Sequence, residues 1–188
     1  MTSKLRLRSA DAARDGAACA AIYDPYVRDT VISLEDVPPD AAEMTARIER
    51  IERSHPYLVA EDDGRVVGFA YGSVHRERAA YRWATDVSVY IDAASHRRGI
   101  GRALYETLFD MLRGQNFLVA GAGITLPNEA SVAIHEGLGF VPVGVYRNIG
   151  YKLGAWRDVG WWQVELAPQL NGQTPPEPTP PRRLEPTP

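Results

Sequence analysis

The stretch that decides the fold runs from Val87 to Tyr105 and reads VSVYIDAASHRRGIGRALY. It begins with β-branched and aromatic residues, which are typical of a strand. A short loop with arginine and glycine follows. From Gly99 onward apolar residues recur at helical spacing, which places Ile100, Leu104 and Leu108 on one face. The stretch therefore predicts a strand, a loop and an amphipathic helix in direct succession.

The loop before this helix has the features of an anion site. The N–H groups that open a helix lack partners within it, and the helix dipole adds positive charge there. Gly99 and Gly101 let a bulky anion approach the backbone, and Arg97, Arg98 and Arg102 can neutralise phosphates. Solvated arginines at an ordinary helix start are the alternative, although serine or aspartate would cap such a helix better. The loop predicts a pyrophosphate site, and it is neither a P-loop nor a dinucleotide fingerprint.

Strands and helices alternate along the rest of the chain. Strands are expected over residues 4–8, 57–60, 65–71, 82–91, 117–125, 141–146 and 159–166. Helices are expected over residues 11–23, 40–53, 99–114 and 128–138, and the first should end at Asp24-Pro25. This order predicts an α/β fold in which helices cover a mixed (α+β) sheet.

Composition places the chain among globular domains and excludes several classes of function. Its 188 residues suit one domain, and 45% hydrophobic residues allow a substantial core. A net charge of −3 argues against nucleic acid as a partner. No apolar run is long enough to span a membrane, and the N-terminus lacks the apolar region of a signal peptide. A cytoplasmic protein without membrane partners is expected.

Cysteine and proline usage limits the organisation further. The single cysteine, Cys19, excludes an internal disulfide and a cysteine-based metal cluster. Residues 167–188 hold 8 of the chain's 14 prolines, so this segment should be an extended or disordered tail. The domain is then expected to span residues 1–166.

Four segments carry a resemblance to a known family. The R-R-G-I-G-R loop resembles the acyl-CoA site of the GNAT acetyltransferases, although His96 stands where that family has Gln or Arg. Asn128, Ser131 and the HEGLGF segment at 135–140 look like the family's second coenzyme motif. Residues 71–83 and 150–163 resemble phosphinothricin N-acetyltransferases and their methionine sulfoximine and arsinothricin relatives. The resemblance covers residues 4–166.

This resemblance implies a GNAT-like acyl-CoA N-acyltransferase fold, with a twisted, mostly antiparallel sheet flanked by helices. It also implies acetyl-CoA as co-substrate and a homodimer. Together with the loop, it predicts that a set of backbone and side-chain groups holds the coenzyme. The set consists of Val89, Tyr90, Ile91, His96, Arg97, Arg98, Gly99, Ile100, Gly101, Arg102, Asn128 and Ser131.

Acetyl transfer to an amine also needs a proton acceptor. Strand alternation puts Asp86, Ser88 and Tyr90 on one face, and the resemblance implies that Asp86 is the base. Phosphinothricin acetyltransferases normally have glutamate there, so the shorter aspartate favours a bridging water. His135 matches the position proposed to protonate the departing thiolate, and histidine exchanges protons near neutrality. A structural strand aspartate and a helix-surface histidine are the alternatives.

Charge suggests the acceptor. Arg76, Arg78 and Lys152 lie in the two subfamily segments near Tyr81, and such cations suit an amino acid with a second anionic group. The resemblance adds Glu35 to the acceptor pocket. Solvated arginines and core aromatics are the alternative. His55 and His75 show no metal-ligand spacing, so no metal is expected.

The sequence thus predicts an acetyl-CoA-dependent N-acetyltransferase for a phosphinothricin-like amino acid, acting by direct transfer with help from a general base. Two alternatives stay open. An enzyme acting on protein N-termini or lysines would favour an acidic acceptor groove. A non-catalytic acyl-CoA-binding module is consistent with the departures at Asp86 and His96.

Overall fold

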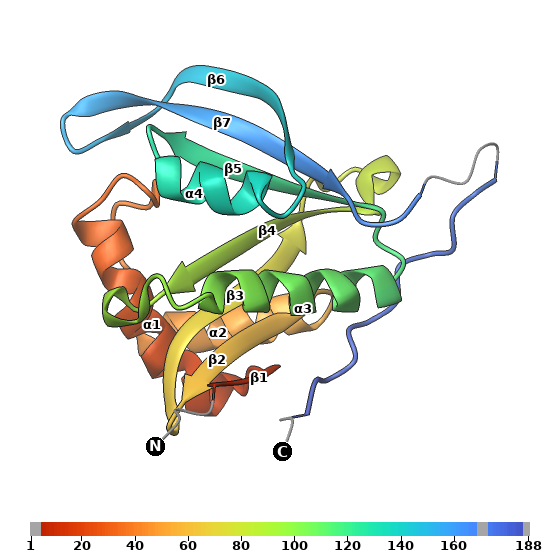
Figure 1. The fold of residues 1–188 in the computed structure, drawn as a ribbon, viewed down its shortest axis with the longest axis horizontal. Helices are drawn as coiled ribbons and strands as arrows, with labels where there is room; N and C mark the ends of the chain where they lie inside the picture. The colour runs from red at the N-terminus through yellow and green to blue at the C-terminus, as the bar shows by residue number, and fades with distance from the viewer. Residues whose placement is uncertain (1–4, 169–172, 186–188) are drawn as a thin grey trace.

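A seven-stranded sheet forms the centre of the computed structural model, which describes residues 5–168 and 173–185 (Figure 1). The strands are β1 (Leu5–Ser9), β2 (Tyr57–Asp62), β3 (Arg65–Val74), β4 (Ala84–Ile91), β5 (Val119–Leu126), β6 (Val141–Lys152) and β7 (Ala155–Glu165). They lie in the order β1-β2-β3-β4-β5-β7-β6, and each neighbouring pair is antiparallel except β4 and β5. The predicted mixed, mostly antiparallel sheet is confirmed.

Helices cover both faces of this sheet. They are α1 (Ala12–Arg28), α2 (Ala41–Glu52), α3 (Ile100–Gly114) and α4 (Glu129–Glu136), with short 3-10 turns η1 (Ala79–Tyr81) and η2 (Ala93–Ser95). The apolar face of α3 packs with inward residues of β2–β5 in one core, and α1 and α2 pack on the other side in a second core. Asp11 and Asp40 cap α1 and α2 by accepting backbone N–H bonds, as their positions before apolar periodic segments predict. No helix among the described residues is long and apolar enough to cross a membrane.

Strand β4 pairs with β5 over its first three residues only, and the gap beyond them is the position of the candidate site. Register holds for Ala84–Val119, Thr85–Ala120 and Asp86–Gly121, whereas β4 continues to pair with β3 as far as Ile91. Beyond Asp86 the two parallel strands therefore separate and leave a V-shaped gap. Because N–H and C=O groups alternate sides along a strand, some of those on β4 face this gap without a strand partner.

Three predicted boundaries are wrong, one in helix α1 and two in the last hairpin. Helix α1 does not end at Asp24-Pro25 but continues through Pro25 to Arg28. Only one turn follows the proline, and Tyr23 and Val27 are buried in the core, so packing outweighs the lost hydrogen bond. The last hairpin is also longer than predicted, because β6 and β7 pair up to Lys152 and Ala155 around a turn at Leu153-Gly154. Both turn residues have positive φ, a conformation that the pattern of apolar residues does not reveal.

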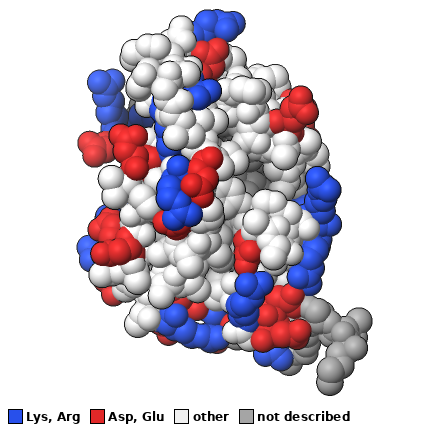
Figure 2. Space-filling model, turned by 90° about the vertical axis from the view of Figure 1, so that its left-hand side faces the viewer, with Lys and Arg blue, Asp and Glu red and all other residues white. Residues whose placement is uncertain are grey.

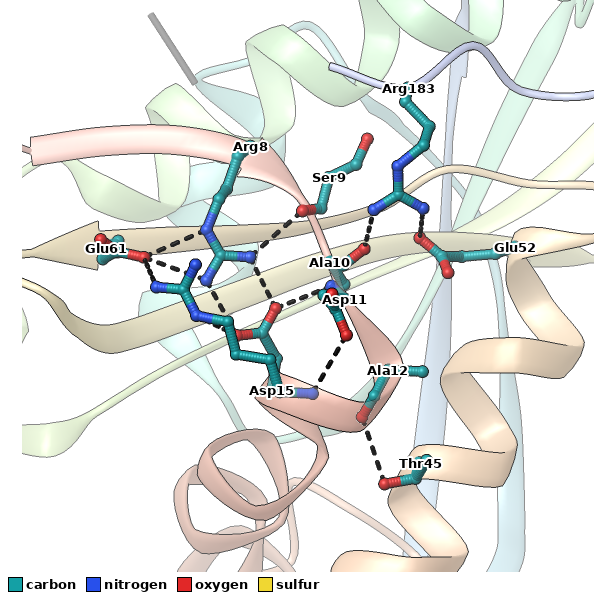
Figure 3. Close-up of polar contacts among 11 residues, drawn as sticks. Arg8, Ser9, Ala10, Asp11, Ala12, Asp15, Thr45, Glu52, Glu61 and Arg183 are labelled. Carbon is teal, nitrogen blue, oxygen red and sulfur yellow. Dashed lines mark hydrogen bonds and ion pairs between the residues drawn. The ribbon is translucent and has the colours of Figure 1, made fainter. Parts of the chain in front are cut away.

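A buried ion-pair network fastens β1 to α1 (Figure 3). Both terminal nitrogens of Arg8 contact the carboxylate of Asp15, at 2.6 and 2.8 Å, and Nη2 also lies 3.0 Å from Glu61. The Asp15 carboxylate is nearly inaccessible, and it also accepts the N–H of Asp11 at 2.8 Å. Breaking one partner of such a pair is costly because the other charge stays buried.

The proline-rich segment lies against the domain. Residues 176–184, here called the strap, contain no helix or strand and pass the C-terminal end of α3 on the way to β1 (Figure 1). Near α3 the strap accepts hydrogen bonds from Trp83, Gln115 and Asn116. At β1, Leu184 exchanges hydrogen bonds with Ser9, and Arg183 donates to Ala10 O at 2.6 Å (Figure 3). The boundary at residue 166 stays a prediction.

Candidate active site

A cavity of about 440 Å³ lies between the loop after β4 and the start of α4. Ten of the twelve predicted coenzyme residues line it: Val89, Ile91, His96, Arg97, Gly99, Ile100, Gly101, Arg102, Asn128 and Ser131. Figure 2 views the side on which β4 and β5 end, where a hollow is bordered mainly by uncharged residues. The structure thus brings together residues from β4, α3 and α4. We call this space the donor cavity.

The start of α3 is built for close approach of an anion. Gly99 has φ of +76°, which favours glycine, and no side chain caps the helix N-terminus there. A Cβ at Gly101 would lie 3.1 Å from Ile134, so glycine keeps the helix start close to α4. Arg97 has no hydrogen bond or ion pair with a described residue. The free N–H groups and this guanidinium can both face a phosphate.

The other two arginines of the loop are engaged elsewhere. Arg98 pairs with Asp62 at 2.8 Å and does not line the donor cavity. Arg102 lines the cavity, but it pairs with Glu106 at 2.8 Å and also donates to Gly137 O. Arg97 is therefore the loop arginine best placed to neutralise a phosphate.

His96 is fixed by a tyrosine that the sequence did not single out. The Tyr26 hydroxyl donates to Ile91 O at 2.6 Å and lies 3.0 Å from Nε2 of His96. Burial raises the pKa of Tyr26, so its hydroxyl stays protonated. Tyr26 thereby links the C-terminal part of α1 to the loop at the mouth of the donor cavity.

A smaller cavity of about 60 Å³ lies in the gap between β4 and β5, lined by Ser88, Tyr90, Tyr105 and His135 among others. Nδ1 of His135 lies 2.7 Å from Ser131 O, so this nitrogen carries the hydrogen. Nε2, 3.1 Å from the Tyr105 hydroxyl, must then accept from it. Burial lowers the pKa of His135 and raises that of Tyr105. The pair is therefore neutral.

Asp86 lies where β4 and β5 begin to part. Its Oδ1 is 2.7 Å from Nδ1 of His75, a residue just beyond β3. Burial raises the pKa of the Asp86 carboxyl, while the contact with His75 and the charge of Arg76 oppose this effect. The carboxylate is about a quarter exposed, so the pair is accessible from one side.

The predicted acceptor residues fall into two groups. Glu35 accepts two hydrogen bonds from Arg47, at 2.8 and 2.9 Å, and one from Tyr23 at 2.9 Å. These contacts keep the pKa of Glu35 below its ordinary value despite partial burial. Lys152 is buried, and its ammonium donates to the carbonyls of Val27, Ser33 and Glu35. In this arrangement Lys152 holds the segment that carries Glu35.

The second group lies beyond the end of β3. Arg76, Arg78 and Tyr81 line a cavity of about 420 Å³, to which Arg53 and Arg82 also contribute. Glu77 and Glu177 line it as well, and Glu177 pairs with Arg82 at 3.2 Å, so cations remain in excess. The guanidinium of Arg76 lies over the ring of Trp161 at 5.8 Å, and the ring of Tyr81 meets that of His75 edge-on. The side chain of Arg78 has no hydrogen bond or ion pair with a described residue. We call this space the basic cavity.

Comparison with known proteins identifies the family. A model of the acetyltransferase (GNAT) domain matches residues 8–161. The chain belongs to the GNAT acetyltransferase family. It is 37% identical over 162 residues to the phosphinothricin N-acetyltransferase of Streptomyces viridochromogenes, covering 86% of this chain and 88% of that protein. It is 42% identical over 152 residues to the enzyme of that name from Alcaligenes faecalis, covering 79% and 77%.

A solved structure agrees with this assignment. The GNAT superfamily phosphinothricin acetyltransferase (Pat) of Sinorhizobium meliloti, in complex with acetyl-CoA, superposes with a TM-score of 0.85 at 35% identity. The match covers 95% of this chain and 94% of that one. The predicted family, fold and acetyltransferase activity are confirmed, and acetyl-CoA is the co-substrate. Among the described residues no group of three or more His, Cys, Asp or Glu side chains is arranged to hold a metal ion.

The donor cavity of this GNAT enzyme fits acetyl-CoA. The uncapped start of α3 and the unpartnered Arg97 suit a diphosphate, and the mainly apolar wall from Val89, Ile91 and Ile134 suits an extended arm. Asn128 accepts the N–H of Ser131 and so caps α4, which fixes both residues at the cavity wall. The gap between β4 and β5 adjoins this cavity, because Ile32, Val89 and Ser131 line both spaces.

Sequence reasoning missed four residues of this site, namely Tyr26, Arg47, His75 and Tyr105. Each acts on a partner from another element or loop of the fold, for example His75 on Asp86 and Tyr26 on His96. Tyr105 ends the stretch from Val87 to Tyr105 that decides the fold, but the pattern there indicates only another residue on the apolar face of the helix. The pairing of β3 with β4 carries the missing information for His75, because it places Ser73 opposite Asp86.

Proposed function

We propose that this acetyltransferase transfers the acetyl group of acetyl-CoA directly to the amine of a phosphinothricin-like amino acid. Phosphinothricin, methionine sulfoximine and arsinothricin are the candidate acceptors. The names of the relatives support this acceptor class. The observation that carries it is the basic cavity. Its Arg76 is the neighbour of His75 in the His75–Asp86 pair, and its Arg78 side chain has no ion pair with a described residue. A guanidinium suits carboxylate and phosphinate alike.

Direct transfer is favoured over a covalent acyl-enzyme. Cys19 lies on the buried face of α1, and burial raises the pKa of its thiol to about 12. A thiol of this kind is a poor nucleophile because the thiolate is the reactive form. The amine therefore attacks the thioester itself.

The residues around the gap have separate roles. Acetyl-CoA supplies an activated acetyl group as a thioester. Backbone N–H groups of β4 near Val89 to Ile91 face the gap and can hold the developing oxyanion. Tyr105 lines the gap, and its hydroxyl can donate its one hydrogen to the departing sulfur by turning away from Nε2 of His135. The ammonium proton of the acceptor is removed on the Asp86 side of β4.

The finer roles of the coenzyme residues are part of this proposal. Arg97 neutralises the diphosphate at the start of α3, and His96 is oriented toward the cavity mouth by Tyr26. Arg98 acts through Asp62, by fixing the loop to β2. Lys152 acts on the acceptor through Glu35, because its three hydrogen bonds hold the segment on which Glu35 lies.

We also infer that a second copy of the chain covers β6. This edge strand and the start of β7 expose large apolar side chains, and Val143, Ile149, Tyr151 and Trp156 are each more than half accessible. An open, apolar edge strand is a surface that proteins normally pair or cover. Light scattering should give a dimer mass for the chain and a lower mass for Val143→Lys. A monomer in both would contradict the inference. A cytoplasmic location also stays a prediction.

Free CoA measured with a thiol reagent tests the acceptor class. The full chain is given acetyl-CoA with anionic amino-acid analogues, with peptides that have free N-termini or lysines, or with aminoglycosides. Turnover confined to the first group supports the proposal. Turnover on peptides alone supports a protein N-acetyltransferase, and acetyl-CoA binding without any thiol release supports a binding module.

A charge-matched pair of variants locates the acceptor. Arg78→Gln should raise the acceptor KM about tenfold or more, as expected for a lost charged hydrogen bond, without changing the KM of acetyl-CoA. Arg50→Gln removes the same charge from an exposed position on α2 and should change neither. Equal effects of the two variants would contradict the assignment of the basic cavity.

A further inference from the structure

His75 and Asp86 form a hydrogen-bonded pair at the point where β4 and β5 separate. Nδ1 of His75 lies 2.7 Å from Oδ1 of Asp86. Gly121 on β5 lies directly across, and a Cβ there would come within 2.9 Å of Oδ1 and 4.0 Å of Nδ1. Glycine at this position therefore leaves room for the pair next to the gap.

The contact fixes which nitrogen of His75 can accept a proton. An ionised carboxylate only accepts hydrogen bonds, so Nδ1 must carry the hydrogen that bridges to Asp86. Nε2 then presents a lone pair, and it has no hydrogen-bond partner among the described residues. The His75 side chain is about a quarter exposed, so a substrate can reach it. An aspartate that orients and stabilises an imidazole in this way is the arrangement of a general base in serine hydrolases.

His75 also extends the distance over which this site can accept a proton from the acceptor amine. Aspartate is one methylene shorter than the glutamate that the resemblance places at position 86, and its Oδ1 is already engaged by His75. The imidazole extends the proton-accepting position beyond the carboxylate. A bridging water is then not needed.

The surroundings of His75 are those proposed for the acceptor. Tyr81 from η1 and Trp161 from β7 meet the His75 ring edge-on, with centroids 5.8 and 6.1 Å away. Arg76, the adjacent residue, places its guanidinium over the same Trp161 and favours ionised Asp86. The charged and titratable groups facing His75 are therefore Asp86, Arg76 and Tyr81.

We propose that His75 is the general base of the transfer and that Asp86 is its positioning residue. Nε2 takes one proton from the acceptor ammonium. The amine nitrogen then forms a bond to the thioester carbon, and the C–S bond breaks with its electron pair leaving on sulfur. The second amine proton passes to the departing thiolate as the amide forms, which gives the CoA thiol, and Asp86 stabilises the imidazolium throughout. This role for His75 rests on the proposed function in one respect, namely that the acetyl group is transferred to an amine.

Kinetics of four variants test the pair. His75→Phe keeps a flat ring of similar size and should lower kcat about 100-fold or more, the usual contribution of a general base. Asp86→Asn should lower it similarly, because an amide no longer fixes the tautomer. His75→Phe with Asp86→Glu should regain at least tenfold over His75→Phe alone, since the longer carboxylate can reach the amine directly. Asp86→Glu alone should not reach the activity of this double variant, because His75 then blocks the longer side chain.

The pH profile separates a base from a structural residue. In the double variant a carboxylate replaces an imidazole, so the acidic limb of kcat/KM should move down by about one pH unit or more. The wild type and the double variant are measured with the same acceptor, so the acceptor's own titration affects both profiles equally. Asp110→Asn, the same carboxylate-to-amide change as Asp86→Asn at an exposed position on α3, should leave kcat and the profile unchanged. If His75→Phe keeps kcat within threefold and an unchanged profile, His75 is not the base.

An NMR measurement that does not depend on turnover tests the pair even if a variant fails to fold. The proton between Nδ1 of His75 and Asp86 should give a downfield signal in the NMR spectrum of the wild-type chain, and Asp86→Asn should abolish it. Absence of the signal in folded wild-type protein would overturn the pair. Absence of wild-type turnover on every amine would instead refute the proposed acceptor class, so the two failures are distinguishable.

Discussion

The hydroxyl of Tyr105 lies 3.1 Å from Nε2 of His135, and both side chains line the gap between β4 and β5. Tyr105 belongs to α3, whose start is the predicted anion site, and His135 belongs to α4, whose start carries Asn128. One hydrogen bond therefore joins the two helices that flank the donor cavity. It also fixes the orientation of the hydroxyl nearest the gap.

Tyr105→Phe should lower kcat about tenfold while leaving the fold intact, because only the hydroxyl is removed. Its loss leaves Nε2 of His135 buried without a partner, at a cost of about 1–3 kcal/mol in the free energy of unfolding. Combining it with His135→Phe should cost little more activity than either change alone, since the two groups act as a unit. Steady-state kinetics and urea unfolding measure both effects. Tyr146→Phe, an exposed tyrosine on β6, is the control, and strictly additive losses would contradict a shared role.

Lys152→Met should destabilise the chain by about 2–4 kcal/mol in urea unfolding. The ammonium satisfies three carbonyls in a buried setting, and methionine fills the space without donating to any of them. The acceptor KM should rise in parallel because Glu35 lies on the segment that is released. A variant with normal stability and weakened acceptor binding would instead indicate that Lys152 contacts the acceptor directly.

The sequence predicts the donor side of the site better than the acceptor side. Gly99, Gly101 and Arg97 follow one another on a strand–loop–helix unit, so local rules place them together. The acceptor side is assembled from α1, α2, β3 and the final hairpin, and its contacts depend on pairings across the fold. Lys152 illustrates the difference. Its charge suggests an anion ligand, but the fold buries it against three carbonyls.

The fold class was predictable because it depends on local apolar patterns. The boundaries of α1 and of the β6–β7 hairpin were not predictable because they depend on tertiary packing. Alternating apolar patterns determine which segments become strands and helices, and they identify the sheet and its covering helices. Helix α1 continues past Pro25 because its next turn buries Val27, and the β6–β7 hairpin turns at Leu153 with φ of +48°. Neither feature is encoded in a local pattern. Tertiary packing decides both.

Truncation after residue 172 should lower the free energy of unfolding by about 1–3 kcal/mol. The change removes the strap, with its hydrogen bonds to Gln115 and Ser9 and the packing of Leu184 against the main core. Prolines limit the freedom of the unfolded strap, so docking it costs less entropy than docking an ordinary segment. Urea unfolding of the truncated and full chains measures the difference. Arg182→Gln, an exposed change on the strap, should have no effect, and an unchanged midpoint after truncation would show that the strap does not stabilise the domain.

Stability should fall as the pH is lowered from 7 to 5, and His55 should account for a large part of the change. Its ring is buried against Phe117, Nε2 has no partner, and burial lowers its pKa to about 4. The unfolded chain binds a proton at this residue below about pH 6.5, whereas the folded chain does so only near pH 4. Stability therefore rises with pH across this window, by about 2 kcal/mol between pH 5 and 7. His135, whose pKa is also lowered, adds to the slope in the same direction.

His55→Phe isolates this contribution. Phenylalanine can keep the stacking on Phe117 and has no group to protonate, so the variant should lose about 2 kcal/mol less than the wild type between pH 7 and 5. It should also match or exceed the wild type at pH 7, because no unpartnered nitrogen stays buried. Urea midpoints at several pH values measure both quantities. Parallel pH dependence in the two proteins would show that His55 does not couple protonation to folding, and the slope would then have to come from other groups such as His135.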